Sequence, residues 1–334
     1  MNKLPRLFLL CLVLIGIASS IAYLESTKPE IAEIFTPTVV TVGSPYQEFQ
    51  SPSGFVNSEP FQLADVVGKK VILLDFWTYS CINCQRTTPY LNAWNEAYAD
   101  DGLLIVGIHS PEFEFEKVLE NVEAAVKEEG ITYPVVLDNE KGIWNAYGNR
   151  YWPRKYLIDL NGNVVYDLIG EGSYEETENK IREVLGITDE MSTPQNTIET
   201  DFSKVTSPET YFGSNRASNL AFATIEPLGL NNDVAYAVGE WEQGEESILA
   251  TLEGTSILYT YTAKNVYMVA SGMNTLKNPS TVEVEVWLDG EYLKTITIGA
   301  ETLYPLIEGT DYGTHTLKLI PKTPGLELFT FTFG

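Results

Sequence analysis

The sequence contains little cysteine and little histidine, with three cysteines and two histidines among its 334 residues. A structural zinc site uses about four Cys or His ligands, and His109 and His315 fall in segments of different predicted structure, so we do not expect a metal. Covalent haem attachment requires a histidine directly after a Cys-x-x-Cys pair, and that position is Gln85. A disulfide scaffold is not expected either, because it would use several pairs and a bridge closing a small loop adds little stability.

Basic residues are also scarce. The chain has 21 Lys and Arg against 46 Asp and Glu, which gives a formal net charge of −25. Nucleic acids and anionic lipid surfaces need a basic face on their protein partner, so neither is expected as a main partner. With 44% hydrophobic and 20% charged residues, the composition is that of a folded protein, and the length allows two domains.

One long apolar run occurs, at the N-terminus. Residues 7–24 are almost entirely apolar and follow Lys3 and Arg6, as in a secretory signal peptide or an uncleaved signal anchor. The run is close to the roughly 20 residues that span a bilayer. We assign residues 1–24 to a signal or anchor. The remaining chain is expected to be extracytoplasmic, tethered to the cytoplasmic membrane by this segment, or secreted if it is cleaved.

Four segments follow this run. Residues 25–58 are rich in Pro, Ser and Thr and are predicted to be a linker. Residues 59–186 alternate apolar strands with amphipathic helices, which is typical of an α/β domain. Residues 187–207 form a second, polar linker, and residues 208–334 show the two-residue period of an all-β sandwich of jelly-roll-like type, with no helical period.

The expected order of elements in the α/β domain is strand, helix, strand, helix, strand, strand, helix, which predicts a mixed sheet with helices on both faces. Two Asx-Gly pairs, Asn161-Gly162 and Asp289-Gly290, predict tight hairpins. The predicted strands are 71–77, 103–109, 133–138 and a pair within 155–170, and the predicted helices are 81–99, 110–129 and 173–186.

Cys81 and Cys84 are the two cysteines outside the apolar N-terminal run, which holds Cys11. They lie one helical turn apart where the strand 71–77 gives way to a helix, so their thiols can reach disulfide distance. At the first turn, Cys81 faces unpaired N–H groups that stabilise a thiolate. We therefore predict a reactive dithiol, with Cys81 as the exposed nucleophile and Cys84 as the resolving thiol.

The pattern Asp-Phe-Trp-x-x-x-Cys-x-x-Cys, with Pro89 in the following helix, resembles the thioredoxin fold. The resemblance implies that Asp75 lies beneath the cysteines and accepts the proton of Cys84. It also implies that Pro89 kinks the helix and that Pro153 is a cis-proline opposite the dithiol. Independently, an acid within an apolar strand lies in a low dielectric, where its pKa rises. The alternative is an exposed Asp75 at the strand end.

The thioredoxin resemblance also implies a substrate site. The backbone beside the cis-proline would pair with the substrate chain, which places substrate at Trp152 and Pro153. Trp77 and Tyr79 would complete an apolar rim around Cys81. Each of these aromatic side chains could equally be an ordinary core or surface residue.

The resemblance extends beyond the fold. The segments FWTYSCINC, HSPEFEFEK and WNAYGNRYWPRKYLID resemble the extracytoplasmic thioredoxin domain of the DipZ family, within the TlpA-like group, and SPETYFG and LELFTFTFG resemble the β domain that follows it there. This implies a thiol–disulfide oxidoreductase that reduces disulfides in exported proteins, with no cofactor beyond the Cys81–Cys84 disulfide. The multi-helix membrane domain of that family is not in this sequence, so a separate membrane electron donor of the CcdA or DsbD type is implied.

A binding role for residues 208–334 is the competing hypothesis. Trp241 and Trp287 could form part of a glycan-binding platform, or the domain could bind a protein and use the thioredoxin domain as a support. A core or interface role for these aromatic residues is the alternative. Three polar residues are expected to have no catalytic role: His109 as a structural strand-end residue, Glu112 as a helix-start carboxylate, and Arg86 as a solvated side chain.

Overall fold

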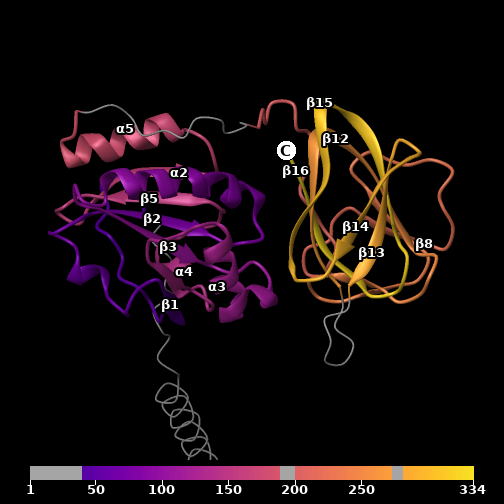
Figure 1. Cartoon of the computed structure of the whole chain (residues 1–334), viewed down its shortest axis with the longest axis horizontal. Coiled ribbons are helices and arrows are strands. Elements are labelled where there is room, and N and C mark those ends of the chain that lie inside the picture. Colours follow the sequence, from indigo (N-terminus) through magenta and orange to yellow (C-terminus); the bar gives the residue numbers. More distant parts are fainter. Residues whose placement is uncertain (1–39, 189–199, 273–280) are drawn as a thin grey trace, which may run out of the picture. The chain divides into compact units, whose positions relative to one another are not determined.

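The computed structural model describes residues 40–188, 200–272 and 281–334 (Figure 1). The predicted signal or anchor segment lies outside these ranges, as do Cys11, the first part of the predicted linker 25–58 and most of the second linker. Within the described ranges, no helix is long and apolar enough to cross a bilayer.

A mixed sheet forms the first domain, and its strands have the order β1-β4-β3-β2-β5-β6. They are β1 (Gly54–Val56), β2 (Val71–Trp77), β3 (Leu103–His109), β4 (Val135–Leu137), β5 (Arg154–Ile158) and β6 (Val164–Ile169). The central strand β2 runs parallel to β3 and antiparallel to β5. All seven residues of β2 are buried, as expected for a strand that is covered on both faces.

Alternate residues of β2 enter two separate hydrophobic clusters, one on each face of the sheet. Leu73 and Trp77 belong to the cluster that receives side chains of α2 (Ile82–Tyr98), α3 (Leu119–Glu128) and α5 (Tyr174–Leu185). Leu74 and Phe76 belong to the cluster covered by α4 (Gly142–Ala146). The expected mixed sheet with helices on both faces is confirmed. Asp75 shares the α2 face, because side chains alternate along a strand.

Residues 40–58 belong to this domain, so the prediction of a linker over 25–58 is wrong for that part. Val40 and Phe49 are buried in the cluster on the α4 face, and β1 pairs with β4. The backbone N–H of Gly43 donates to the carbonyl of Val164 (2.8 Å). Two of these contacts, the β1–β4 pairing and the Gly43 hydrogen bond, are made by the backbone, so the polar composition of the segment did not reveal them.

The predicted helix over 110–129 begins later than expected. Ser110 does not cap a helix: its N–H donates to the carbonyl of Trp77 and its hydroxyl to Asp138. The chain then forms the short 3-10 helix η2 (Glu114–Lys117) before α3. Because the backbone of Ser110 is bound to the end of β2, the chain cannot begin a helix there, and α3 starts only at Leu119. The short helix α4 was not predicted at all.

The second domain is built from strands, and residues 200–272 and 281–334 contain no helix. Its ten strands form one connected sheet. The long β12 pairs with β15 along most of its length, and its other edge pairs with β9 at residues 256–259 and with β16 at residues 266–272. β13 and β14 meet at Asp289-Gly290, both with positive φ, so the predicted hairpin is confirmed. The strands are β7 (Thr210–Tyr211), β8 (Leu220–Ala223), β9 (Ala235–Val238), β10 (Trp241–Gln243), β11 (Ile248–Ala250), β12 (Ser256–Gly272), β13 (Val282–Leu288), β14 (Glu291–Ile298), β15 (Thr302–Pro321) and β16 (Leu326–Phe333).

The two domains share an aromatic contact. The ring of Phe329, in β16, lies 5.2 Å from that of Phe113 and 4.9 Å from that of Phe115, centroid to centroid. Val269 of β12 joins the same cluster. The β domain therefore packs against the loop that follows β3, close to the predicted dithiol.

Candidate active site

Cys81 is the N-cap of α2, at the end of the loop that leaves β2. Its Sγ accepts a hydrogen bond from the backbone N–H of Cys84, at 3.4 Å. Both cysteines are free thiols; Cys81 is half-buried and Cys84 is buried. This confirms the predicted placement of the pair on the first turn, where the unpaired N–H groups of a helix favour a negative sulfur.

Cys84 lies in the interior below Cys81. Burial raises the pKa of the Cys84 thiol, and the hydrogen bond with Cys81 and the charges of Cys81 and Asp75 raise it further. A thiol in this position stays protonated until a base removes its proton. The two cysteines thus occupy different environments, one open and one closed.

Asp75 and Lys155 form a buried pair, and the charge of Asp75 acts on the thiol of Cys84. They are opposite each other in the antiparallel register of β2 and β5, and Lys155 Nζ lies 3.6 Å from Asp75 Oδ1. Asp75 is 3% exposed and Lys155 is fully buried. Burial raises the pKa of Asp75 to about 6, against the opposing effect of the Lys155 charge. The burial expected for Asp75 is confirmed. The sequence analysis did not identify Lys155 as the partner of Asp75, although a lysine in the strand that pairs with β2 could have indicated it.

The Trp152–Pro153 peptide bond is cis, as the resemblance implies. Trp152 is half-buried, and its indole N–H donates to the carbonyl of Ser110 (2.8 Å). Its ring lies 4.3 Å from that of Trp144, centroid to centroid. The loop before β5 is therefore held in place by a ring contact and a hydrogen bond.

Trp77 and Tyr79 do not form an apolar rim, so that prediction is wrong. They are only 3% and 4% exposed. Their rings pack on the ring of His109, at centroid distances of 5.2 Å and 5.8 Å. Two large aromatic residues beside a strand end are drawn into the core because burying their area is favourable. The open space beside Cys81 is instead bordered on the thioredoxin side by two other aromatic residues, the half-exposed Tyr151 and Trp152.

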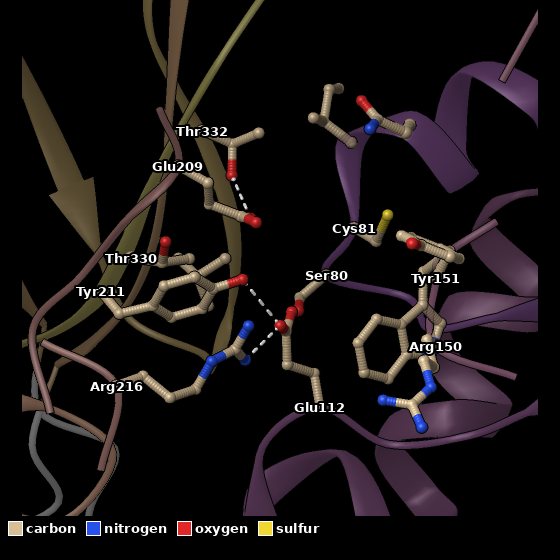
Figure 2. A pocket seen from close by; sticks show the side chains of 14 residues that line it. Ser80, Cys81, Glu112, Arg150, Tyr151, Glu209, Tyr211, Arg216, Thr330 and Thr332 are labelled. Carbon is tan, nitrogen blue, oxygen red and sulfur yellow. Dashed lines mark hydrogen bonds and ion pairs between the residues drawn. The ribbon is translucent and has the colours of Figure 1, made fainter. Parts of the chain in front are cut away.

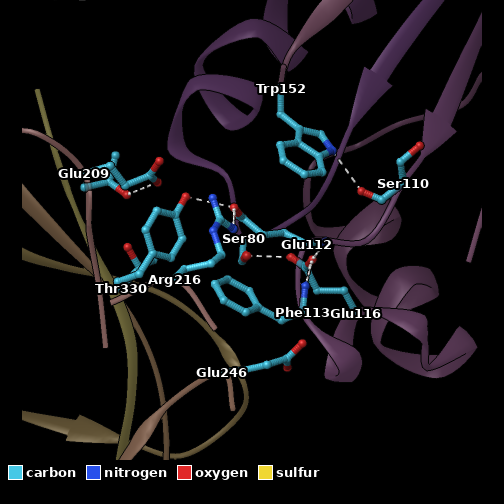
Figure 3. A network of polar contacts seen from close by, with 12 residues as sticks. Ser80, Ser110, Glu112, Phe113, Glu116, Trp152, Glu209, Arg216, Glu246 and Thr330 are labelled. Carbon is cyan, nitrogen blue, oxygen red and sulfur yellow. Dashed lines mark hydrogen bonds and ion pairs between the residues drawn. The ribbon is translucent and has the colours of Figure 1, made fainter. Parts of the chain in front are cut away.

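Glu116 is a second buried carboxylate near the dithiol (Figure 3). It accepts a hydrogen bond from the hydroxyl of Ser80, the residue before Cys81, at 2.5 Å. Its other oxygen accepts from the backbone N–H groups of Glu112 and Phe113. Burial, and then the charge of Glu112, raise the pKa of Glu116 to about 7. Glu116 thus links the Cys81 loop to the loop after β3.

A cleft of about 180 Å³ opens beside Cys81 between the two domains (Figure 2). On the thioredoxin side its lining residues are Ser80, Cys81, Ile82, Asn83, Glu112, Arg150, Tyr151 and Trp152. On the other side they are Glu209, Tyr211, Arg216, Val269, Thr330 and Thr332, which we call the β wall. The β wall had no signal in the sequence, because its residues lie far along the chain from the cysteines.

Glu112 connects the two sides of this cleft. Its carboxylate accepts hydrogen bonds from the hydroxyl of Tyr211 (2.9 Å) and the guanidinium of Arg216 (2.5 Å), and only 9% of its side chain is exposed. The expected role as a helix-start carboxylate is wrong, because the short helix η2 begins only at Glu114 and the Glu112 carboxylate is bound to Tyr211 and Arg216 instead.

The structure contradicts the role expected for Arg86 and agrees with the one expected for His109. The expectation that Arg86 is a solvated side chain is wrong. Arg86 makes a two-point ion pair with Glu171 (2.6 and 2.8 Å) and lies over the ring of Tyr267 in β12. His109 is fully buried, and burial lowers its pKa to about 3. A neutral, enclosed imidazole fits the expected structural role.

Trp241 and Trp287 are half-buried in the β domain. The indole N–H of Trp241 donates to the carbonyl of Val238, and Trp287 packs edge-on against Tyr292, at an interplanar angle of 77°. Glycan binding by these residues stays a prediction. Within the described residues, no group of three or more His, Cys, Asp or Glu side chains could hold a metal ion.

Comparison with known families matches both domains. A family described as Redoxin matches residues 41–185, and one described as Thioredoxin like C-terminal domain matches residues 207–334. A solved thiol:disulfide interchange protein of the thioredoxin family from Chlorobium tepidum is 26% identical, with a TM-score of 0.38, over 44% of this chain and 99% of that one.

Two relatives extend the comparison. Protein DipZ of Mycobacterium bovis is 35% identical over 302 residues, which is 84% of this chain but 42% of DipZ, so the chain spans less than half the length of that relative. The thiol-disulfide oxidoreductase ResA of Geobacillus kaustophilus is 30% identical over 187 residues, which is 55% of this chain and 99% of ResA. The chain therefore belongs to the TlpA-like thiol–disulfide oxidoreductases of the thioredoxin superfamily, together with ResA and DipZ.

Proposed function

We propose that the chain is an extracytoplasmic reductase of protein disulfides, with Cys81 and Cys84 as its redox-active dithiol. The observation that carries the proposal is the contrast between the two thiols. Cys81 caps a helix and borders an open cleft, whereas Cys84 is closed off above a buried carboxylate. One thiol is placed to meet a substrate, and the other to act only after the first has reacted.

The reaction proceeds in two exchanges. The Cys81 thiolate attacks one sulfur of a substrate disulfide; an S–S bond forms between enzyme and substrate, and the first substrate sulfur leaves as a thiolate. Cys84 then loses its proton and attacks Cys81 Sγ. This forms the Cys81–Cys84 disulfide and releases the second substrate thiolate. Two electrons pass from the dithiol to the substrate, and both substrate sulfurs are protonated by solvent.

Asp75 acts in the second exchange as the proton acceptor for Cys84. A general base works best when its pKa lies near the working pH, and burial brings the pKa of Asp75 to about 6. Lys155 keeps the carboxylate charged in an interior that would otherwise favour the neutral acid. Trp152 lines the cleft beside Cys81, and its backbone and that of Pro153 would hold the substrate chain during both exchanges.

The reducing direction and the location are proposed from the family. No cofactor beyond the dithiol is required, so the oxidised enzyme has to be reduced by another protein, and we propose a separate membrane electron donor of the CcdA or DsbD type. The apolar residues 7–24 would keep the enzyme at the membrane or direct its secretion. Its substrates would then be exported proteins.

Reduction of insulin disulfides by the full chain tests the proposal. Cys81→Ala should abolish turnover, and Cys84→Ala should trap a mixed disulfide with the substrate. Cys11→Ala is the matched control, because it removes the third cysteine without touching the dithiol, and it should retain activity. Full insulin reduction by Cys81→Ala would refute the proposal. Equilibration of the dithiol with glutathione then gives its potential, which decides the direction in a range of roughly −270 to −120 mV.

A further inference from the structure

We propose that the β wall selects the substrate: it restricts Cys81 to disulfides carried on an extended, flexible segment of polypeptide. The inference rests on the proposed reductase function and adds the class of substrate. It assigns a task to the second domain that concerns the same cysteines, and it makes Tyr211, Glu209 and Thr332 substrate-contacting residues.

The β wall is held firmly opposite Cys81. Phe329 packs between the domains against Phe113 and Phe115, with centroid distances near 5 Å. Polar contacts surround this aromatic contact: the Glu112 carboxylate accepts from Tyr211 and Arg216, and the backbone N–H of Glu114 donates to Glu246 (3.0 Å). An aromatic centre with a polar margin is the anatomy of a specific interface. The position of the wall is therefore part of the fold.

A second group of contacts fixes the wall to the active-site helix itself. Arg86, in the second turn of α2, lies 5.9 Å from the ring centre of Tyr267 in β12, and its ion pair with Glu171 orients the guanidinium. The hydroxyl of Tyr79, two residues before Cys81, donates to the carbonyl of Glu301 (3.5 Å). The β domain thus contacts the elements on both sides of Cys81.

The dimensions of the cleft set the kind of substrate. A stable contact with a folded protein covers about 800 Å² on each partner and needs a broad, open surface. The space in front of Cys81 is instead a narrow cleft with a volume of about 180 Å³, and the β wall forms its far side. A folded surface cannot reach the Cys81 sulfur without displacing that wall. A single extended chain can enter, because neighbouring extended chains lie only about 4.8 Å apart.

The chemistry of the cleft fits a peptide backbone better than a charged ligand. Its two arginines, Arg150 and Arg216, are balanced by Glu112 and Glu209, and Arg216 is already paired with Glu112. Five of the ten other lining residues carry hydroxyls, which donate and accept hydrogen bonds of the strength that peptide groups make. An extended chain offers such groups at every residue.

Three substrates test the inference with the full chain: a linear peptide closed by one disulfide, a stably folded protein with one solvent-exposed disulfide, and hydroxyethyl disulfide. The kcat/KM of each is divided by the rate constant for its reduction by dithiothreitol, which removes differences in intrinsic reactivity. We expect the peptide to exceed the folded protein by at least about tenfold. Equal normalised values for peptide and folded protein would overturn the inference.

Variants of the β wall provide the second arm. Thr332→Trp fills the cleft and should lower the ratio of peptide to hydroxyethyl disulfide reduction about tenfold, while Tyr211→Ala opens it and should raise the normalised value for the folded protein about fivefold. Glu176→Ala, on the exposed face of α5, is the control and should leave both ratios unchanged. Circular dichroism verifies that each variant is folded. If neither ratio moves, the wall does not select substrates; if no disulfide is reduced in a Cys81-dependent way, the proposed function itself fails.

Discussion

Asp75 and Lys155 face each other across β2 and β5, with 3.6 Å between the carboxylate and the ammonium, in a part of the core where neither side chain is more than slightly exposed. This separation is longer than a hydrogen bond. Each charge therefore stabilises the other at a distance, and the facing oxygen of Asp75 has no hydrogen-bond partner. An acceptor that is charged but not fully engaged is suited to receive a proton from Cys84.

The first prediction concerns Asp75→Asn. Removal of the base should slow the attack of Cys84 on the mixed disulfide about a hundredfold, since a positioned base contributes rate enhancements of this order. The first exchange, made by Cys81, should change far less. Stopped-flow release of a chromogenic thiol bound to Cys81 measures the second exchange alone. Asp101→Asn, on an exposed loop, is the control; an unchanged release rate in Asp75→Asn would show that another group takes the proton.

The second prediction concerns Lys155→Met. The charge of Lys155 lowers the pKa of Asp75 and so opposes the effect of burial. Without it, the pKa of Asp75 should rise by about 1 to 3 units. The rate of the second exchange, which should increase with pH through about 6 in the wild type, should then have its midpoint at higher pH. A pH–rate profile measures the shift, and a midpoint that stays in place would contradict the role of Lys155.

The third prediction concerns stability and pH. The pKa of Glu116 is raised from 4.5 to about 7 in the folded state, so the folded state binds this proton more tightly than the unfolded state. The resulting stabilisation is complete below about pH 4.5 and is lost as the pH rises through about 7, by an amount of about 3 kcal/mol. Glu116→Gln should not show this loss. Urea unfolding of both proteins from pH 5 to 8 gives the difference.

The comparison with Glu116→Gln also cancels other titrations. The pKa of His109 is lowered to about 3, so its contribution runs in the opposite direction and is lost as the pH falls below about 6.5. Both proteins carry His109 and share this term. If their free energies of unfolding stay parallel from pH 5 to 8, Glu116 is ionised alike in the folded and unfolded states.

The fourth prediction compares two ion pairs. Arg86 and Glu171 are 16% and 8% exposed at their side chains, so Arg86→Met should leave a carboxylate with little water or counter-charge and cost about 2–3 kcal/mol of unfolding free energy. Lys180 and Glu183 are 37% and 67% exposed, and Lys180→Met should cost less than about 1 kcal/mol. Thermal and urea unfolding measure both. Equal losses would mean that Arg86 is not a buried partner.

Local patterns in the sequence predicted the parts of the site that depend on neighbouring residues. The apolar run 71–77 became β2, and the spacing of Cys81 and Cys84 placed them on one helical turn. A cis bond at Pro153 was expected from resemblance rather than from the dipeptide. In the first two cases the signal lies within a few residues of the feature.

The remaining parts of the site depend on distant pairings. Glu112 has the sequence context of a helix start, yet it accepts hydrogen bonds from Tyr211 and Arg216 of another domain. Trp77 and Tyr79 were predicted to lie on an apolar rim around Cys81, but both are buried in the core, where their rings pack on the ring of His109. Tertiary packing determines whether such a side chain is exposed or buried and what it contacts, and no local sequence pattern indicates which surface will cover it.

The position of Phe329 affects how variants of this protein should be interpreted. Its ring supports Phe113, which is adjacent to Glu112 and donates its N–H to Glu116, and Glu116 in turn holds Ser80 beside the nucleophile. A substitution at Phe329 would therefore be recorded in an activity screen as a defect of the thiols, even though the residue belongs to the last strand of the other domain. Genetic data that assign phenotypes domain by domain would attribute such a substitution to the function of the β domain, although its effect is on the dithiol.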